Sequence, residues 1–118
     1  MPYQAVILTV SDSCAAGTRT DTSGPAIRAM LENAGFAVQA MQTIPDEEGQ
    51  ISAAIVHACD ILQADLVVTT EGTGLSPRDV TPEATLAVLD REIRAIPVAM
   101  WVEGLKSTPR AMLSRAVA

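Results

Sequence analysis

The chain has 118 residues, a length that suits one domain spanning 1–118, and 48% of them are hydrophobic, which is enough to bury a core. Its formal net charge of −6 argues against nucleic acid or an anionic membrane as the main partner, because both are bound through basic surfaces. No apolar run approaches the length of a membrane span, and no signal peptide is visible. Cys14 and Cys59 fit no metal or redox spacing, so we expect a reducing, cytoplasmic setting.

A short apolar run at 3–10 predicts a buried parallel strand, and a polar loop follows it at 11–23. The loop is long for a strand-to-helix connection, and long loops often carry function. A helix is predicted next, with Ser23 as its cap and Gly35 as its end. Its apolar face is marked by residues at helical spacing, namely Ala26, Ile27, Met30, Leu31 and Ala34.

Two more strands and a second helix continue the alternation. The segment 36–44 predicts a strand that ends before Pro45, and 66–68 predicts a strand buried on both faces. Between these strands, helical spacing is found at Ile51, Ala54, Ile55, Ala58 and Leu62.

The last third of the chain adds helices and a tail. Thr81, followed by a proline and an acid, predicts a helix cap, and the helix should continue through Val88. A further helix is expected within 96–105, and the tail 111–118 is a candidate strand. Alternation of this kind predicts an α/β fold of three layers, with a mainly parallel sheet and helices on both faces.

Polar side chains follow each predicted strand, where open α/β sheets bind their ligands. Ser11, Asp12 and Ser13 follow the first strand, Asp46 the second, and Glu71-Gly72-Thr73-Gly74 the third. Since parallel strands end at the same edge of a sheet, the three loops should converge there.

The residues alone leave the chemistry of this edge open. The turn at Gly72 and Gly74 can bring backbone N–H groups close to a phosphate, or it can be a tight turn without a ligand. Asp46 and Asp79 can hold Mg²⁺ together with phosphate oxygens, yet such aspartates more often serve ordinary turns. Serines such as Ser11 more often satisfy loop backbone than bind ligands.

Four blocks of sequence carry a resemblance, and they run in order over nearly the whole chain: Thr9 to Cys14, Ile44 to Glu47, Thr69 to Thr85, and Thr108 to Arg115. Together they resemble the MogA/MoaB family of molybdenum cofactor biosynthesis. The first block is especially similar to the N-terminal domain of gephyrin.

The resemblance implies a MoaB/Mog-like molybdopterin-binding domain that forms a homotrimer and works beside other cofactor-biosynthesis proteins. Adenylyltransferase members join molybdopterin to AMP from Mg-ATP and release pyrophosphate. By resemblance, Asp46 and Asp79 are the catalytic and Mg²⁺-binding residues. The implied substrate-binding residues are Ser11, Asp12, Ser13, Glu71, Gly72, Thr73, Gly74 and Ser114.

Two departures from the family pattern lead to alternatives. Glu71 stands where the family has glycine, and its carboxylate adds negative charge beside an expected phosphate. The chain stops at Ala118, before the strand, loop and helix with which family members normally close, so a C-terminal truncation is expected. The alternatives to an enzyme are a non-catalytic module that binds pterin or nucleotide, and a trimeric scaffold.

Overall fold

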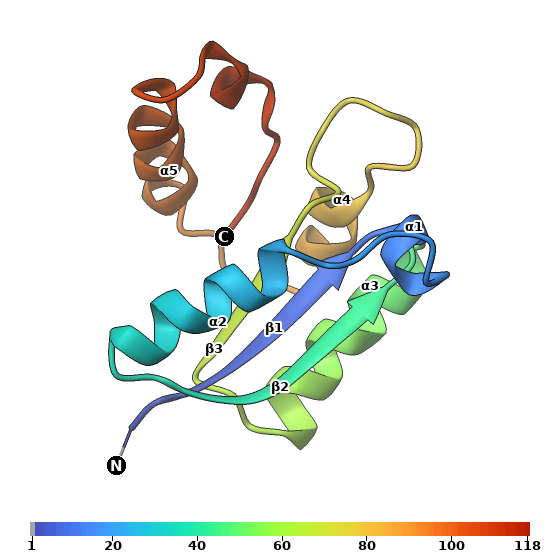
Figure 1. Ribbon diagram of the computed structural model, residues 1–118, viewed down its shortest axis with the longest axis vertical. Coiled ribbons are helices and arrows are strands. Elements are labelled where there is room, and N and C mark those ends of the chain that lie inside the picture. The colour runs from blue at the N-terminus through green and yellow to red at the C-terminus, as the bar shows by residue number, and fades with distance from the viewer. Residues whose placement is uncertain (1) are drawn as a thin grey trace.

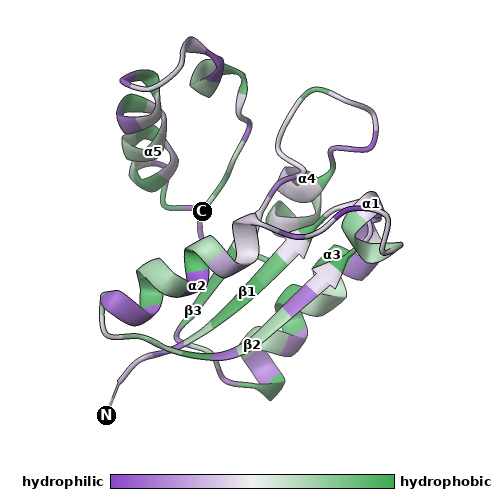
Figure 2. Ribbon diagram, viewed as in Figure 1, coloured by the Kyte–Doolittle hydropathy of each residue, from purple (hydrophilic) through white to green (hydrophobic). Residues whose placement is uncertain are grey.

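Three parallel strands form the centre of the computed structural model, which describes residues 2–118 (Figure 1). The central strand β1 (Gln4–Val10) lies between β2 (Ala37–Ile44) and β3 (Leu66–Thr70). It is hydrophobic over most of its length, as Figure 2 shows, and all but its first residue are buried. A continuous apolar strand of this kind is typical of a parallel sheet covered on both faces.

The register of the strands sets the position of the three loops that follow them. Val10 pairs with Ile44 across β1 and β2, and Thr9 pairs with Thr70 across β1 and β3. The carboxyl ends of all three strands therefore lie at one edge of the sheet.

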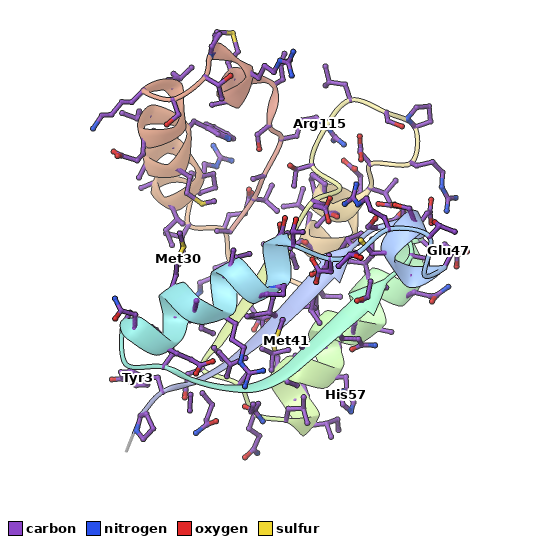
Figure 3. All side chains as sticks on the ribbon, viewed as in Figure 1. Tyr3, Met30, Met41, Glu47, His57 and Arg115 are labelled. Atoms are coloured by element: carbon purple, nitrogen blue, oxygen red, sulfur yellow. The ribbon has the colours of Figure 1, made fainter. Side chains whose placement is uncertain are left out.

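One face of the sheet is covered by α2 (Ser23–Asn33), which Figure 1 shows crossing in front of the strands. The helix approaches the sheet closely at Gly24. A Cβ there would collide with the Asp21 carboxylate and lie 3.0 Å from the Thr9 hydroxyl, so glycine is required for this contact. Met41 of β2, labelled in Figure 3, lies beneath the same helix, its methyl group 3.1 Å from that Cβ position.

The other face is covered by α3 (Glu48–Val56), the π-helical turn η1 (His57–Ile61) and α4 (Thr81–Leu86). Apolar side chains of these elements and of the first two strands form the buried core: Val6, Leu8, Val10, Ile44, Ile51, Ile55, Ala58 and Ala84. The predicted three-layer arrangement with helices on both faces is confirmed.

The region after α4 stands beside the sheet rather than on it (Figure 1). Here α5 (Ala95–Leu105) packs against the 3-10 helix η2 (Pro109–Leu113) (Figure 1). Much of α5 is hydrophobic, as the ribbon colours of Figure 2 show. Many apolar side chains of this region are exposed: Ile93, Ile96, Val98, Met100, Val102, Leu105, Met112 and Leu113. Within residues 2–118, no helix combines the length and apolarity that crossing a membrane requires.

The strands and helices of the first two thirds are confirmed, but three predictions about burial and pairing were wrong. The third strand is only half-buried, because β3 is the edge of the sheet. Three of the five residues predicted to form the apolar face of the first long helix, namely Ala26, Met30 and Ala34, are exposed on α2 or at its C-cap, Met30 by 72%, because only Ile27 and Leu31 of this set are turned partly toward the sheet. The tail 111–118 forms the end of η2 and an extended segment, because its contacts are made to loops rather than to a strand.

Helix boundaries differ from the prediction in three places. The loop 11–23 contains a single helical turn, α1 (Asp12–Ala15), which the Ser11 side chain caps. Ser23 is the first residue of α2 and not its cap. The helix predicted to run through Val88 ends at Leu86, and Thr81 is its first residue, with its hydroxyl bonded to a loop carbonyl.

Candidate functional site

The loops after β1 and β2 are joined by a reciprocal pair of hydrogen bonds. The backbone N–H of Asp12 donates to Oδ2 of Asp46 over 2.9 Å, and the N–H of Asp46 donates to Oδ1 of Asp12 over 2.9 Å. The Ser11 N–H also donates to the Ile44 carbonyl over 2.8 Å, continuing the ladder beyond β1. The first two loops thus form one unit at the edge of the sheet. We call this edge the rim; it comprises the loops after β1, β2 and β3 and the tail residues that contact them.

The loop after β3 joins this unit through Arg78. Its guanidinium donates from Nε to Oδ2 and from Nη2 to Oδ1 of Asp12, over 3.0 and 2.9 Å. Bidentate pairing of this kind fixes orientation as well as charge. The hydrogen bonds from Arg78, and next the Asp46 N–H, lower the pKa of Asp12. The Asp12 carboxylate is therefore occupied in holding three loops together.

The pKa of Asp46 is shifted in the opposite direction from that of Asp12. Burial raises the pKa of the Asp46 carboxyl, and the nearby negative charges of Asp12 and Asp79 add to the rise. A carboxylate whose ionised form is disfavoured in this way gains from a neighbouring cation. Glu47, labelled in Figure 3, follows at the exposed end of the same loop.

The glycine turn, Gly72–Gly74, lies against the side chain of Asp79. Gly72 has a φ of +72°, and a Cβ there would collide with the Thr81 hydroxyl at the start of α4. A Cβ on Gly74 would lie 2.9 Å from Oδ2 of Asp79, and this oxygen accepts a hydrogen bond from the Ser76 N–H over 3.0 Å. The Asp79 carboxylate therefore lies directly against the turn.

The C-terminal tail holds the turn in place through Arg115, a role that sequence reasoning missed. Its backbone N–H donates to the Thr73 carbonyl, and its guanidinium donates to the carbonyls of Gly74 and Asp79, over 2.8, 2.7 and 2.7 Å. The same guanidinium forms an ion pair with Glu83, which lowers the pKa of that carboxyl. Figure 3 shows Arg115 pointing from the tail toward this loop. No sequence motif indicated this contact.

The predicted serines lie at the rim with structural partners. The Ser11 hydroxyl accepts from the Cys14 N–H over 3.3 Å and lies 3.2 Å from the Ser13 hydroxyl. Ser114 reaches the turn, with its hydroxyl 3.5 Å from that of Thr73. Ser11 is buried, so its main task is to close the first turn of the loop.

Glu71 takes an uncommon backbone conformation at the end of β3. Its φ is +73°, in the left-handed region where non-glycine residues are strained. One carboxylate oxygen pairs with Arg19 of the first loop, while Oε2 is buried and has no hydrogen-bond partner within residues 2–118. The pair links the first loop to the glycine turn, and sequence reasoning did not anticipate Arg19.

The pair Asp46 and Asp79 suits a magnesium ion in its donor chemistry. Within residues 2–118, the hydrogen bonds to these two carboxylates reach Oδ2 of each, so that Oδ1 of each is available. The described part of the chain contains no group of three or more His, Cys, Asp or Glu side chains arranged to hold a metal. Mg²⁺ commonly takes one or two carboxylates and completes its shell with phosphate oxygens and water, so these residues fit it only together with a phosphorylated ligand.

All the predicted site residues therefore lie along one rim, on the loops after the three strands and on the tail. The rim contains the carboxylates of Asp46 and Asp79 and the glycine turn. Arg78 and Arg115 hold its loops in position. Their roles toward a ligand stay predictions.

Comparison with known proteins gives this geometry a family. The model for a probable molybdopterin binding domain matches residues 6–118. The chain is 41% identical over 113 residues to a molybdopterin adenylyltransferase of Haemophilus influenzae, covering 94% of this chain and 57% of that protein. It is 38% identical over 122 residues to gephyrin of Dictyostelium discoideum, covering 95% of this chain and 17% of that protein. The chain thus spans little more than half of the first relative and a much smaller part of the second.

Solved structures agree in fold. The molybdopterin biosynthesis enzyme MoaB of Thermus thermophilus has a TM-score of 0.92 and 45% identity, covering 98% of this chain and 73% of that one. A molybdopterin biosynthesis protein of Mycobacterium abscessus has a TM-score of 0.93 and 41% identity over the same shares. With the motifs, the family match and the fold in agreement, the chain belongs to the molybdopterin-binding domain family that includes MoaB and MogA.

Proposed function

We propose that residues 1–118 form a molybdopterin-binding domain that acts in the cytoplasm in molybdenum cofactor biosynthesis, as a molybdopterin adenylyltransferase. The observation that carries this proposal is the meeting of Asp46, Asp79 and the Gly72–Gly74 turn at one rim. Similarity to proteins named molybdopterin adenylyltransferase supports the choice of reaction.

The proposed reaction transfers AMP from ATP to the terminal phosphate of molybdopterin. A phosphate oxygen of the pterin attacks the α-phosphorus of ATP and forms a new P–O bond. The bond between the α-phosphorus and its bridging oxygen breaks, and pyrophosphate leaves with the electron pair. Transfers of this type depend mainly on alignment and charge neutralisation, so rigid loops are the chief requirement.

The residues of the rim can meet that requirement. The hydrogen bonds that Asp46 and Asp79 accept from loop backbone hold the two carboxylates in place. Both would hold Mg²⁺, which neutralises phosphate charge when bound. N–H groups of the glycine turn would donate to phosphate oxygens. Arg115 fixes that turn through two carbonyls, so it acts as a positioning residue.

The test is to incubate the protein with molybdopterin and Mg-ATP and to measure adenylated pterin. We expect product from the wild type and a loss of at least about 100-fold in Asp79→Asn, the scale of a lost group that stabilises the transition state. Asp60→Asn, on the exposed turn η1, is the matched control and should keep full activity. Unchanged turnover in Asp79→Asn would remove this residue from the mechanism.

A second candidate is a domain that binds pterin or nucleotide without catalysis. Glu71 favours it, because the carboxylate lies next to the turn on which a phosphate is expected. Binding of Mg-ATP or molybdopterin by calorimetry, without adenylated product, would support this candidate over the enzyme.

We also propose that the chain assembles as a homotrimer, on its own or with other proteins of the same biosynthesis. Exposed apolar side chains on α5 support association, since apolar patches of this kind commonly mark protein contacts. Light scattering coupled to size exclusion should give three times the mass of one chain. A single-chain mass at micromolar concentration would contradict the trimer.

A further inference from the structure

The three arginines of the rim, Arg19, Arg78 and Arg115, differ in how many hydrogen bonds their guanidinium groups make. Arg78 gives two hydrogen bonds to Asp12, and Arg115 bonds to two backbone carbonyls and to Glu83. Arg19 has Glu71 as its charged partner, with the Cys14 thiol as a further neighbour. Its side chain is 54% exposed. Within residues 2–118, Arg19 gives one side-chain hydrogen bond, whereas Arg78 gives two and Arg115 four, so Arg19 keeps the most N–H donors for a ligand.

The partner that holds Arg19 is itself poorly accommodated. Glu71 adopts a φ of +73°, and its Oε2 is shielded from solvent without accepting a hydrogen bond within residues 2–118. A buried oxygen without a donor and a strained backbone both cost free energy, and such costs are concentrated at functional sites. Only one of the two Glu71 carboxylate oxygens therefore has a hydrogen-bond donor within residues 2–118.

The position of this pair matters for ligand binding. Glu71 directly precedes Gly72, and its backbone carbonyl accepts from the Thr81 hydroxyl at the start of α4. Arg19 reaches it from the far end of the first loop. The Arg19 guanidinium therefore lies beside the turn whose N–H groups are expected to face a phosphate.

We propose that Arg19 is an anion-binding residue of the rim and that Glu71 occupies its guanidinium when no ligand is bound. A phosphate group offers the planar guanidinium several oxygens and more negative charge, so it displaces the Glu71 carboxylate, which is then free to reach water. Glu71 thereby sets the affinity of the rim for phosphorylated ligands. The choice of nucleotide and pterin phosphate as natural ligands depends on the proposed function, whereas the exchange of anions does not.

A double-mutant cycle read by calorimetry tests this inference. The titrants are pyrophosphate, ATP and molybdopterin, each added separately to the full chain. The variants are Glu71→Gln, Arg19→Gln and the double variant. Arg28 and Glu32 form an exposed ion pair on α2, and the same substitutions there are matched controls for a lost surface charge.

We expect Glu71→Gln to tighten the binding of pyrophosphate about three- to tenfold and Arg19→Gln to weaken it by a similar factor, the scale of a partly screened charge contact. In the Arg19→Gln background, Glu71→Gln should change affinity by less than about twofold, because the two side chains act as one unit. The control variants should leave affinity unchanged. A non-additive effect with pyrophosphate or ATP assigns Arg19 to the nucleotide, and one with molybdopterin alone assigns it to the pterin phosphate.

Two results would overturn the inference. One is weaker anion binding in Glu71→Gln, and the other is an equal gain with and without Arg19, which marks a general charge effect. Thermal melts of every variant show whether it folds, and Glu71→Gly, which relieves the strained backbone, replaces Glu71→Gln if the latter does not. Non-additive anion binding without adenylated pterin would refute the enzyme and leave this inference standing, whereas the reverse result would refute only the inference.

Discussion

The rim and the α5–η2 region use their side chains in opposite ways. At the rim, Asp12 forms hydrogen bonds with both Asp46 and Arg78, so polar side chains join three loops inside the chain. On α5, apolar side chains such as Met100 lie in solvent. The loops of the rim are thus held by hydrogen bonds, as the proposed ligand binding requires, while α5 exposes the apolar surface on which the proposed trimer rests.

Arg115 joins the two regions. It follows η2 in the chain and reaches back to the glycine turn and α4 (Figure 3). The comparison can be tested by mutating each region separately.

The largest expected effect is the difference in unfolding free energy between a substitution in the core beneath the rim and one on α5. Ile51 is fully buried between α3 and the sheet, so Ile51→Ala should lower the free energy of unfolding by roughly 2–5 kcal/mol. Met100→Ala, on the exposed face of α5, should change it by less than about 0.5 kcal/mol. Urea titrations measure both. Equal losses would show that α5 is packed as tightly as the core.

A smaller effect is expected at the glycine turn. Gly72→Ala introduces a Cβ at a φ of +72° and against the Thr81 hydroxyl, so we expect a loss of about 1–3 kcal/mol in unfolding free energy. Gly49→Ala is the control, because this glycine is helical with open space around it. There we expect a gain of about 0.5–1 kcal/mol. The two substitutions should shift the melting temperature in opposite directions, and shifts of the same sign would contradict the close contact at Gly72.

Removing Arg115, which links the two regions, should lower the unfolding free energy by a comparable or smaller amount. Arg115→Ala leaves the carbonyls of Gly74 and Asp79 without their donor, and we expect a loss of about 1–2 kcal/mol in unfolding free energy. Under the proposed function, adenylylation should fall as well, because the turn is no longer fixed. Arg110→Ala on the exposed η2 is the matched control and should leave both unchanged. Normal activity in Arg115→Ala would exclude a positioning role.

The smallest expected effect concerns Asp12 and Asp46, whose carboxylates each accept a hydrogen bond from the backbone N–H of the other residue. The folded-state pKa of Asp12 is lowered, so its ion pair stabilises the fold above the ordinary value of 3.8 and is lost as the pH falls through the folded pKa. The folded-state pKa of Asp46 is raised, so its stabilising contribution is complete below 3.8 and lost as the pH rises through the folded pKa. At pH 7, thermal melts should therefore show Asp12→Asn less stable and Asp46→Asn slightly more stable than the wild type.

Both differences should shrink as the pH approaches 3.8. Shifts of the same sign in the two variants at pH 7 would contradict the opposite environments of the two groups. A more stable but inactive Asp46→Asn would indicate that the carboxylate is kept for chemistry and not for folding.

The sequence predicted the alternation of strands and helices well, because apolar periodicity reports burial directly. It also placed Asp46 and Gly72 at one edge, since parallel strands share the direction in which their loops emerge. The half-buried state of β3 was missed, because an apolar run does not show whether a strand lies at an edge. The contacts of Arg19 and Arg115 were also missed, because long flexible side chains meet partners distant in sequence and leave no local pattern.

The central claim is that the rim, and not α5, binds phosphorylated ligand. Titration of the ¹⁵N-labelled protein with Mg-ATP, followed by amide chemical shifts, tests it most directly. We expect the largest shifts in three segments, 11–14, 46–47 and 71–79, with α5 unaffected. Shifts confined to α5, or none at millimolar nucleotide, would contradict the account.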